Sequence, residues 1–357
     1  MTRLTSLRNE MEKKGFGGYF TMSVKNIYYL TGFKDISGAA LSLIIPLDGT
    51  PVLLTQPLSY VAASEKAEGC VVKDVGFKGS FLGETVRELR RLKAERLGFD
   101  DLTIAMYLSL GEKLGGSMKL IHSPETVMRL RRRKDEREIQ YIMRAAMLTD
   151  EGAEAGIEAV KAGIHEYEIA AEIEYAMRIH GSEGVAFETV VASGPRSALP
   201  HGLSSDRIVR EGDFVTMDLG AVYSGYCCDI TRTVTAGKPS SKQLQMLDTV
   251  LKAQGEAFKS IRAGEKTRSV DDAARRVLEE EGFGGSFIHG LGHGVGLDIH
   301  EAPTLSPKSR EVLEEGNVVS NEPGIYIQGF GGVRIEDTVW VHRDKGENLT
   351  KAAYHKR

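Results

Sequence analysis

Residues 213–234 read DFVTMDLGAVYSGYCCDITRTV, two apolar runs joined by a Tyr-Ser-Gly-Tyr turn, which is the pattern of a β-hairpin. Paired positions in an antiparallel hairpin have a constant index sum, and a sum of 447 places Asp218 opposite Asp229. Their Cβ atoms are then expected about 4.5–5.5 Å apart. Two carboxylates this close repel each other unless a proton or a cation intervenes. The stretch therefore predicts a hairpin that carries a cation-binding acidic pair.

A second acidic hairpin follows about a hundred residues later. NVVSNEPGIYI (317–327) and GGVRIEDTVWV (331–341) flank a glycine-rich turn, and Glu322 and Glu336 have an index sum of 658, centred on Gly329. Pro323 cannot donate a ladder hydrogen bond, so a bulge or a strand edge is expected beside the acid. A single acid could be a surface carboxylate or an ion-pair partner of Arg334. Two facing pairs favour a metal site.

The two hairpins belong to an internal repeat. Ala162-Gly163 and Ala263-Gly264 each precede a helical pattern that contains Ala-Ala, and the two acids of each hairpin recur after 104 (322 minus 218) and 107 (336 minus 229) residues. Such offsets are typical of a duplicated αβ unit. We predict an α+β chain with a small α/β domain over residues 1–121, including a hairpin at Asp48-Gly49, and the duplicated domain over 122–357.

Four carboxylates carry a charge of −4, which two divalent ions would neutralise, and dinuclear hydrolases hold two such ions about 3.5–4 Å apart. Carboxylate-rich ligation suits manganese, and one imidazole shifts the preference toward cobalt, iron or zinc. The histidine-rich stretch HGLGHGVGLDIHE (289–301) lies between the hairpins. The sequence therefore predicts two divalent ions and a histidine ligand from this stretch.

The glycines of this stretch bear on how many of its histidines reach one ion. Four glycines in seven residues disfavour a helix, at roughly 1 kcal/mol each relative to alanine. In an extended segment, His289 and His293 lie on one face but about 13 Å apart, and His300 faces the other way if the strand continues. One ligand is expected rather than three, and spacing alone does not say which.

Residues 123–345 resemble the pita-bread metallopeptidases, specifically the prolidase and aminopeptidase P branch. The blocks that carry the resemblance are SALPHG (197–202), MDLGAVYSGYCCDITRT (217–233), IHGLGHGVGLDIHE (288–301), NEPGIYI (321–327) and GGVRIEDT (331–338). Residues 1–120 are similar to the creatinase-like N-terminal domain of that family. The resemblance implies a pita-bread catalytic domain with pseudo-twofold symmetry.

The resemblance also implies a role for each matching residue. The implied metal ligands are Asp218, Asp229, His293, Glu322 and Glu336, with Asp229 and Glu336 bridging two ions. Glu322 matches the residue that shuttles the proton. His201, His289 and His300 match substrate-side histidines, Arg334 an arginine near the active site, and Thr231 a partner of the ligands. The implied reaction is hydrolysis of the Xaa-Pro bond of dipeptides by a metal-bridging hydroxide.

One departure from the family keeps the substrate open. Many prolidases have an arginine just after the His-Glu-x-Pro step, where it can hold the carboxylate of a dipeptide, but this sequence has Thr304. Lys308 or Arg310 could substitute for it. An aminopeptidase P that acts on longer peptides is therefore the alternative. A metal-free creatinase-like amidinohydrolase, a peptide-binding scaffold and a methionine aminopeptidase are less favoured, because the ligand set is intact and SALPHG is present.

Composition limits the partners. A net charge of −4 with no long basic stripe argues against nucleic acid, and no apolar run approaches the ~20 residues of a membrane span. Three cysteines and no signal-peptide pattern indicate a cytoplasmic protein, and the family resemblance implies a homodimer. The basic run at 129–134 is followed at once by DERE and predicts a solvated helix start.

Overall fold

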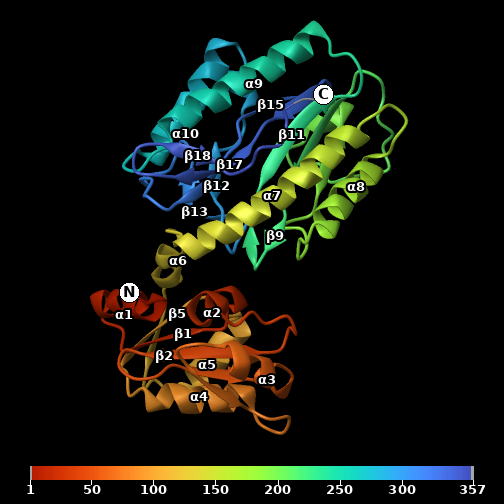
Figure 1. The fold of residues 1–357 in the computed structure, drawn as a ribbon. Coiled ribbons are helices and arrows are strands. Elements are labelled where there is room, and N and C mark those ends of the chain that lie inside the picture. Colours follow the sequence, from red (N-terminus) through yellow and green to blue (C-terminus); the bar gives the residue numbers. More distant parts are fainter. Residues whose placement is uncertain (1, 355–357) are drawn as a thin grey trace. The chain divides into compact units, whose positions relative to one another are not determined.

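The computed structural model describes residues 2–354 and divides into two compact units after Arg131 (Figure 1). The boundary predicted from the sequence lies between residues 121 and 122. Helix α6 (Glu125–Arg131) packs against helix α1 (Arg3–Lys14) of the first unit. The division of the structure therefore falls after this helix.

A six-stranded sheet forms the centre of the first unit, in the order β4-β3-β2-β1-β5-β6. Its strands are β1 (Gly18–Thr21), β2 (Leu41–Pro46), β3 (Val52–Thr55), β4 (Val71–Asp74), β5 (Arg96–Phe99) and β6 (Lys119–His122). The other helices are α2 (Val24–Thr31), α3 (Pro57–Lys66), α4 (Phe81–Arg91) and α5 (Ile104–Leu114). Strands β2 and β3 pair in antiparallel fashion around Asp48-Gly49, which confirms the predicted hairpin.

The second unit combines two helix pairs with antiparallel sheets. Its helices are α7 (Glu136–Ala159), α8 (Glu166–Ile179), α9 (Ser241–Ser260) and α10 (Thr267–Glu280), with short 3₁₀ turns η1 (Gly194–Ala198) and η2 (Gly284–Ser286). The first half contains β7 (Val190–Ser193), β8 (Phe214–Leu219), β9 (Val222–Tyr223), β10 (Tyr226–Cys227) and β11 (Ile230–Thr235). The second contains β12 (Gly292–Gly294), β13 (Glu301–Leu305), β14 (Val318–Asn321), β15 (Gly324–Ile327), β16 (Gly331–Arg334), β17 (Asp337–Val341) and β18 (Gly346–Asn348). Figure 1 shows α7–α8 beside β11 and α9–α10 beside the later strands.

The predicted internal repeat is confirmed by equivalent contacts in the two halves. Helices α8 and α10 begin 101 residues apart (267 minus 166), and each packs against the helix before it. The residue before each helix forms an isolated antiparallel bridge, His165 with Ile208 and Lys266 with Val312. Each helix pair also covers its own cluster of buried apolar side chains. The second unit is therefore a duplicated αβ fold.

The register predicted for the first acidic hairpin is wrong. Asp218 pairs with Thr231 and not with Asp229. The two central residues of the turn are Ser224 and Gly225, both with positive φ (47° and 78°), as a two-residue type I′ loop requires. The turn is centred one residue later than the sequence pattern suggested. The index sum of every pair is therefore 449 (218 plus 231) and not the predicted 447.

The register predicted for the second hairpin is confirmed. Strands β15 and β16 pair from Gly324–Arg334 to Ile327–Gly331, and β14 pairs with β17 at Asn321–Asp337, all with the index sum of 658. Strand β14 ends before Glu322, and β15 begins after Pro323. The proline therefore interrupts the ladder where the two glutamates face each other, as its missing N–H predicts.

A fully buried arginine lies behind the two hairpins. Arg232 donates hydrogen bonds to the backbone oxygen of Glu336, to Oδ1 of Asp337 and to the backbone oxygen of Ala352. Oδ2 of Asp337 accepts a further hydrogen bond from the hydroxyl of Tyr354. These contacts join β11, β17 and the C-terminal segment Leu349–Tyr354 into one buried network.

Candidate metal centre and substrate pocket

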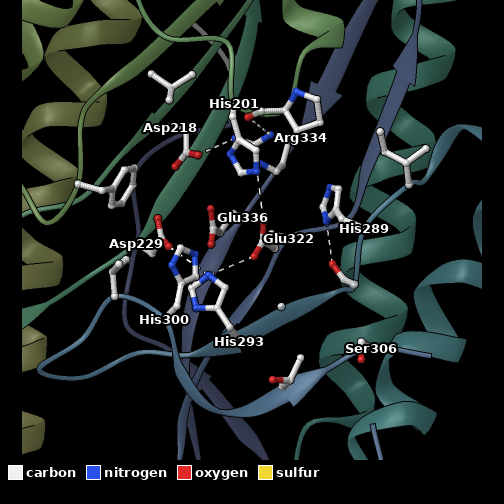
Figure 2. Close-up of a pocket in the computed structure, with 18 of the residues that line it drawn as sticks. His201, Asp218, Asp229, His289, His293, His300, Ser306, Glu322, Arg334 and Glu336 are labelled. Atoms are coloured by element: carbon white, nitrogen blue, oxygen red, sulfur yellow. Dashed lines mark hydrogen bonds and ion pairs between the residues drawn. The ribbon is translucent and has the colours of Figure 1, made fainter. Parts of the chain in front are cut away.

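All nine residues predicted to form the site line one pocket of about 660 Å³ in the second unit (Figure 2). The five predicted metal ligands are Asp218, Asp229, His293, Glu322 and Glu336, and the four predicted substrate residues are His201, His289, His300 and Arg334. Asp218 lies on β8 and His293 on β12, whereas the other acids lie in breaks next to strands. The pocket therefore draws on both copies of the duplication.

Of the three histidines in 289–301, His293 lies closest to the acids. Its Nε2 is 3.5 Å from Oδ2 of Asp229 and 3.3 Å from Oε1 of Glu322. Single ligand atoms of Asp229, His293 and Glu336 all lie within 4.8 Å of one another. Nδ1 of His293 lies 3.1 Å from the oxygen of Gly294 and donates there, so Nε2 is the nitrogen that faces the acids. When protonated, Nε2 donates to Glu322, and without its proton it can bind a metal ion. This arrangement could hold a metal ion.

Three carboxylate oxygens at the centre of the site have no hydrogen-bond partner among the described residues. These buried atoms are Oδ1 of Asp218, Oδ1 of Asp229 and Oε1 of Glu336. Burial raises the pKa of all three carboxyl groups, and repulsion from neighbouring carboxylates raises them further. Unpartnered buried oxygens are costly, and divalent cations satisfy them while replacing the protons. The residues present therefore fit a pair of divalent ions.

Glu322 differs from the other acids in its charge state. Burial raises the pKa of its carboxyl group, but the hydrogen bond and positive charge of His293 outweigh this effect and lower the pKa to about 2. The hydroxyl of Ser320 donates to Oε1 of Glu322 at 3.0 Å and accepts from the backbone N–H of His293 at 3.0 Å. Ser320, which the sequence did not single out, thus contacts two predicted ligands, the backbone of His293 on β12 and the side chain of Glu322 after β14.

Two equivalent threonines connect the hairpins. The hydroxyl of Thr231 donates to Oε2 of Glu336 at 2.7 Å, and Nε of Arg334 donates to the same hydroxyl at 3.0 Å. Thr338 lies 107 residues later (338 minus 231), and its hydroxyl donates to the backbone oxygen of Asp229 at 2.8 Å. Each hairpin therefore holds an acid of the other.

His289 contacts a tyrosine that the sequence did not reveal. Nη1 of Arg334 donates to the hydroxyl oxygen of Tyr326 at 2.9 Å, so the single O–H of Tyr326 donates to Nε2 of His289, also 2.9 Å away. Nδ1 of His289 lies 2.7 Å from the oxygen of Gly290 and must carry its proton. Burial lowers the pKa of His289. A neutral ring with both nitrogens engaged presents an apolar surface to the pocket.

Arg334 itself is committed to the acids. Its Nη2 lies 2.6 Å from Oδ2 of Asp218 and its Nε lies 4.0 Å from Oε2 of Glu322. Although burial lowers the pKa of a guanidinium, the hydroxyl of Tyr326 and the surrounding carboxylates raise that of Arg334 well above its ordinary value. This arginine is therefore a fixed positive charge on the wall of the pocket.

His300 does not face away from His293 as a continuing strand would require. The chain turns after β12, and the two rings lie 4.2 Å apart in an edge-to-face arrangement. The next residue, Glu301, forms an ion pair of 2.7 Å with Lys134, and their side chains are 2% and 1% exposed. The prediction that 129–134 is a solvated helix start is thus wrong, because Arg131 and Lys134 are buried and the run begins in the last turn of α6.

Thr304 stands where many prolidases have an arginine, so this position carries no positive charge. Thr304 lines the pocket and is exposed, whereas Lys308 and Arg310 are not among its described lining residues. Arg334 is the only lysine or arginine of that lining. A free carboxylate in this pocket therefore meets hydroxyl groups and histidines, with Glu188 also on the wall.

Two family models match the chain. Residues 140–343 match metallopeptidase family M24, and residues 3–133 match the creatinase/prolidase N-terminal domain.

Among the described residues, no helix is long and apolar enough to cross a membrane.

Similar proteins extend over nearly the whole chain. An Xaa-Pro dipeptidase of Pyrococcus furiosus is 39% identical over 352 residues, which cover 98% of this chain and 97% of that protein. The structure of an Xaa-Pro dipeptidase from Bacillus anthracis is 36% identical with a TM-score of 0.93, covering 98% of this chain and 97% of that one. An X-Pro aminopeptidase structure from Thermotoga maritima is 34% identical with a TM-score of 0.87, covering 97% and 98%.

Proposed function

Because the chain belongs to metallopeptidase family M24, we propose that it hydrolyses the Xaa-Pro bond of dipeptides. It is a metal-dependent Xaa-Pro peptidase with a pita-bread catalytic domain and a creatinase-like N-terminal domain. Similarity to dipeptidases over almost the full length supports the dipeptide as substrate.

We assign the metal site to the five residues Asp218, Asp229, His293, Glu322 and Glu336. The observation that carries this assignment is the convergence of three unpartnered carboxylate oxygens with Nε2 of His293. We propose manganese or cobalt, with zinc or iron as alternatives, because four carboxylates and one imidazole suit these ions. When bound, the ions supply Lewis acidity toward the scissile carbonyl and lower the pKa of water.

The remaining residues bind the substrate and move protons. The carboxylate of Glu322 lies in the pocket beside Nε2 of His293, so it accepts a proton from the attacking water and passes it to the leaving proline nitrogen. His201 and His300 line the pocket and stabilise the carbonyl oxygen as its charge develops. The neutral ring of His289, with Phe187 and Ile288 on the same lining, offers an apolar wall to the proline ring.

The substrate is tested with an Xaa-Pro dipeptide and its C-terminal amide, which differ only in the terminal charge. A dipeptidase cleaves the free acid faster, whereas equal or faster cleavage of the amide contradicts this proposal. Xaa-Ala is the control for proline specificity, and its cleavage at the rate of Xaa-Pro would refute that specificity. Each substrate is assayed with manganese, cobalt, zinc and iron.

A second candidate is an aminopeptidase P that removes the first residue of longer peptides. It is favoured by Thr304, by the absence of any lysine or arginine other than Arg334 from the described pocket lining, and by similarity to an X-Pro aminopeptidase. A kcat/KM for an Xaa-Pro-Yaa tripeptide that is well above the kcat/KM for the free dipeptide supports this candidate.

We also propose a cytoplasmic homodimer. The three cysteines are free, as expected in a reducing compartment. Light scattering of the purified protein tests the oligomeric state, and a monomer at micromolar concentration contradicts the proposal.

A further inference from the structure

The His201 ring makes no hydrogen bond within the part of the chain that the structure describes. Its position therefore depends on the backbone of the segment 194–205, which follows β7 and contains η1. Ser197 of this segment accepts a hydrogen bond from the backbone N–H of Gly332 at 2.8 Å. Ser193, the last residue of β7, and Ser205, the last residue of the segment, contact the same buried side chain outside the pocket, that of Glu166.

Glu166 is the first residue of α8 and is fully buried. Its Oε1 accepts from the backbone N–H and hydroxyl of Ser193 at 2.7 and 2.8 Å. Its Oε2 accepts from the backbone N–H and hydroxyl of Ser205 at 3.1 and 2.7 Å, and from Arg196. Five donors satisfy both oxygens of this carboxylate. Only an ionised carboxylate can accept this many hydrogen bonds, because neither of its oxygens carries a proton.

We propose that Glu166 is a positioning residue that fixes His201 at the wall of the substrate pocket. This inference rests on the proposed function, in which His201 contacts the substrate. The carboxylate closes residues 193–205 into a loop by binding both of its ends. Arg196 strengthens this loop, because it also donates to the backbone oxygen of Leu203 at 2.8 Å.

The other half of the duplication supports a specific role for this carboxylate. Thr267 occupies the equivalent position at the start of α10, and its hydroxyl donates to Ser309 at 2.8 Å. Thr267 contacts the segment of its own half at Ser309 and Glu311, and the pocket histidine of that segment, His300, lies outside those residues. The side chain at the start of α10 therefore contacts one side of its segment, whereas Glu166 contacts both ends of the loop that carries His201.

The test combines Glu166→Gln with His201→Ala in a double-mutant cycle on an Xaa-Pro peptide. Glutamine keeps the shape but has one accepting oxygen and directs an NH₂ group at the donors. We expect Glu166→Gln to lower kcat/KM by about 10- to 100-fold, as misplaced catalytic groups do, with unchanged metal content. In the His201→Ala background the same change is expected to have no further effect. Additive losses would overturn the proposal.

Two further variants and one control complete the design. Arg196→Met and Ser205→Ala each remove one of the five donors to Glu166, so they test the proposal if Glu166→Gln does not fold. Glu88→Gln is the matched control, since Glu88 is a buried carboxylate paired with Lys73 and Arg91 in the other unit, and it should leave kcat/KM unchanged.

Hydrogen exchange separates this proposal from the proposed function. Amides of residues 194–205 are expected to exchange faster in Glu166→Gln and Arg196→Met, whatever the substrate is. Unchanged exchange in both variants overturns the positioning role. A wild-type protein that cleaves no Xaa-Pro peptide instead overturns the proposed function.

Discussion

Replacing Thr231 by valine should weaken metal binding while leaving the fold intact. Valine has the shape of threonine but removes the hydroxyl that donates to Oε2 of Glu336 at 2.7 Å. It also removes the acceptor of Nε of Arg334 at 3.0 Å. A hydrogen bond to a charged group contributes about 1.5–3 kcal/mol. Losing it should lower metal affinity by about 10- to 100-fold.

The measurement is calorimetric titration of the metal-free protein with manganese, for the wild type and two threonine variants. Thr338→Val is the matched control, because Thr338 occupies the equivalent position but contacts the backbone of Asp229. It should lower the melting temperature with a smaller effect on metal affinity. Thr231→Ser, which keeps the hydroxyl, should restore most of the lost affinity.

Two results would refute this reasoning. Thr231→Val could bind manganese within roughly two-fold of the wild type, which corresponds to less than about 0.5 kcal/mol. Alternatively, Thr338→Val could weaken binding as much as Thr231→Val does. Either result means that the Thr231 hydroxyl does not orient Glu336 toward the metal.

Three other predictions concern the pocket and its acids. Thr304→Arg should raise kcat/KM for an Xaa-Pro dipeptide by about ten-fold relative to its amide, because arginine pairs with a carboxylate; an unchanged acid-to-amide ratio contradicts this. Tyr326→Phe should lower kcat/KM by about ten-fold through loss of the link between His289 and Arg334, with unchanged metal content measured by mass spectrometry. In the metal-free protein, the raised pKa values of Asp229 and Glu336 contribute stability at low pH that is lost as the pH rises. The melting temperature difference between metal-loaded and metal-free protein should therefore grow with pH in calorimetry, and a constant difference contradicts it.

The sequence predicted the repeat and the second hairpin because both follow from local spacing. The first hairpin was misplaced because its centre depends on positive φ at Ser224, and serine does not signal that conformation as glycine does. His300 was misplaced for a related reason, since the turn between β12 and β13 has no marker in the alternating glycines.

Thr231 was predicted as a partner of the ligands, but Tyr326 and Glu166 were not, because their partners are distant in the chain. Tyr326 and His289 are 37 residues apart, and Lys134 and Glu301 are 167 apart. Spacing rules apply within one helix or hairpin and do not extend to how those elements pack. The sequence did not single out Glu166 for the same reason, since its partners Ser193 and Ser205 are 27 and 39 residues away.

The network around Arg232 has a consequence for how the enzyme is made. The proposed ligands span residues 218 to 336, and the segment that closes the network behind them includes Ala352 and Tyr354. During synthesis, a nascent chain that has released only the first hairpin has half the acids and no imidazole from β12. We therefore expect metal binding to require both hairpins, because the first hairpin alone lacks His293 and two of the four acids.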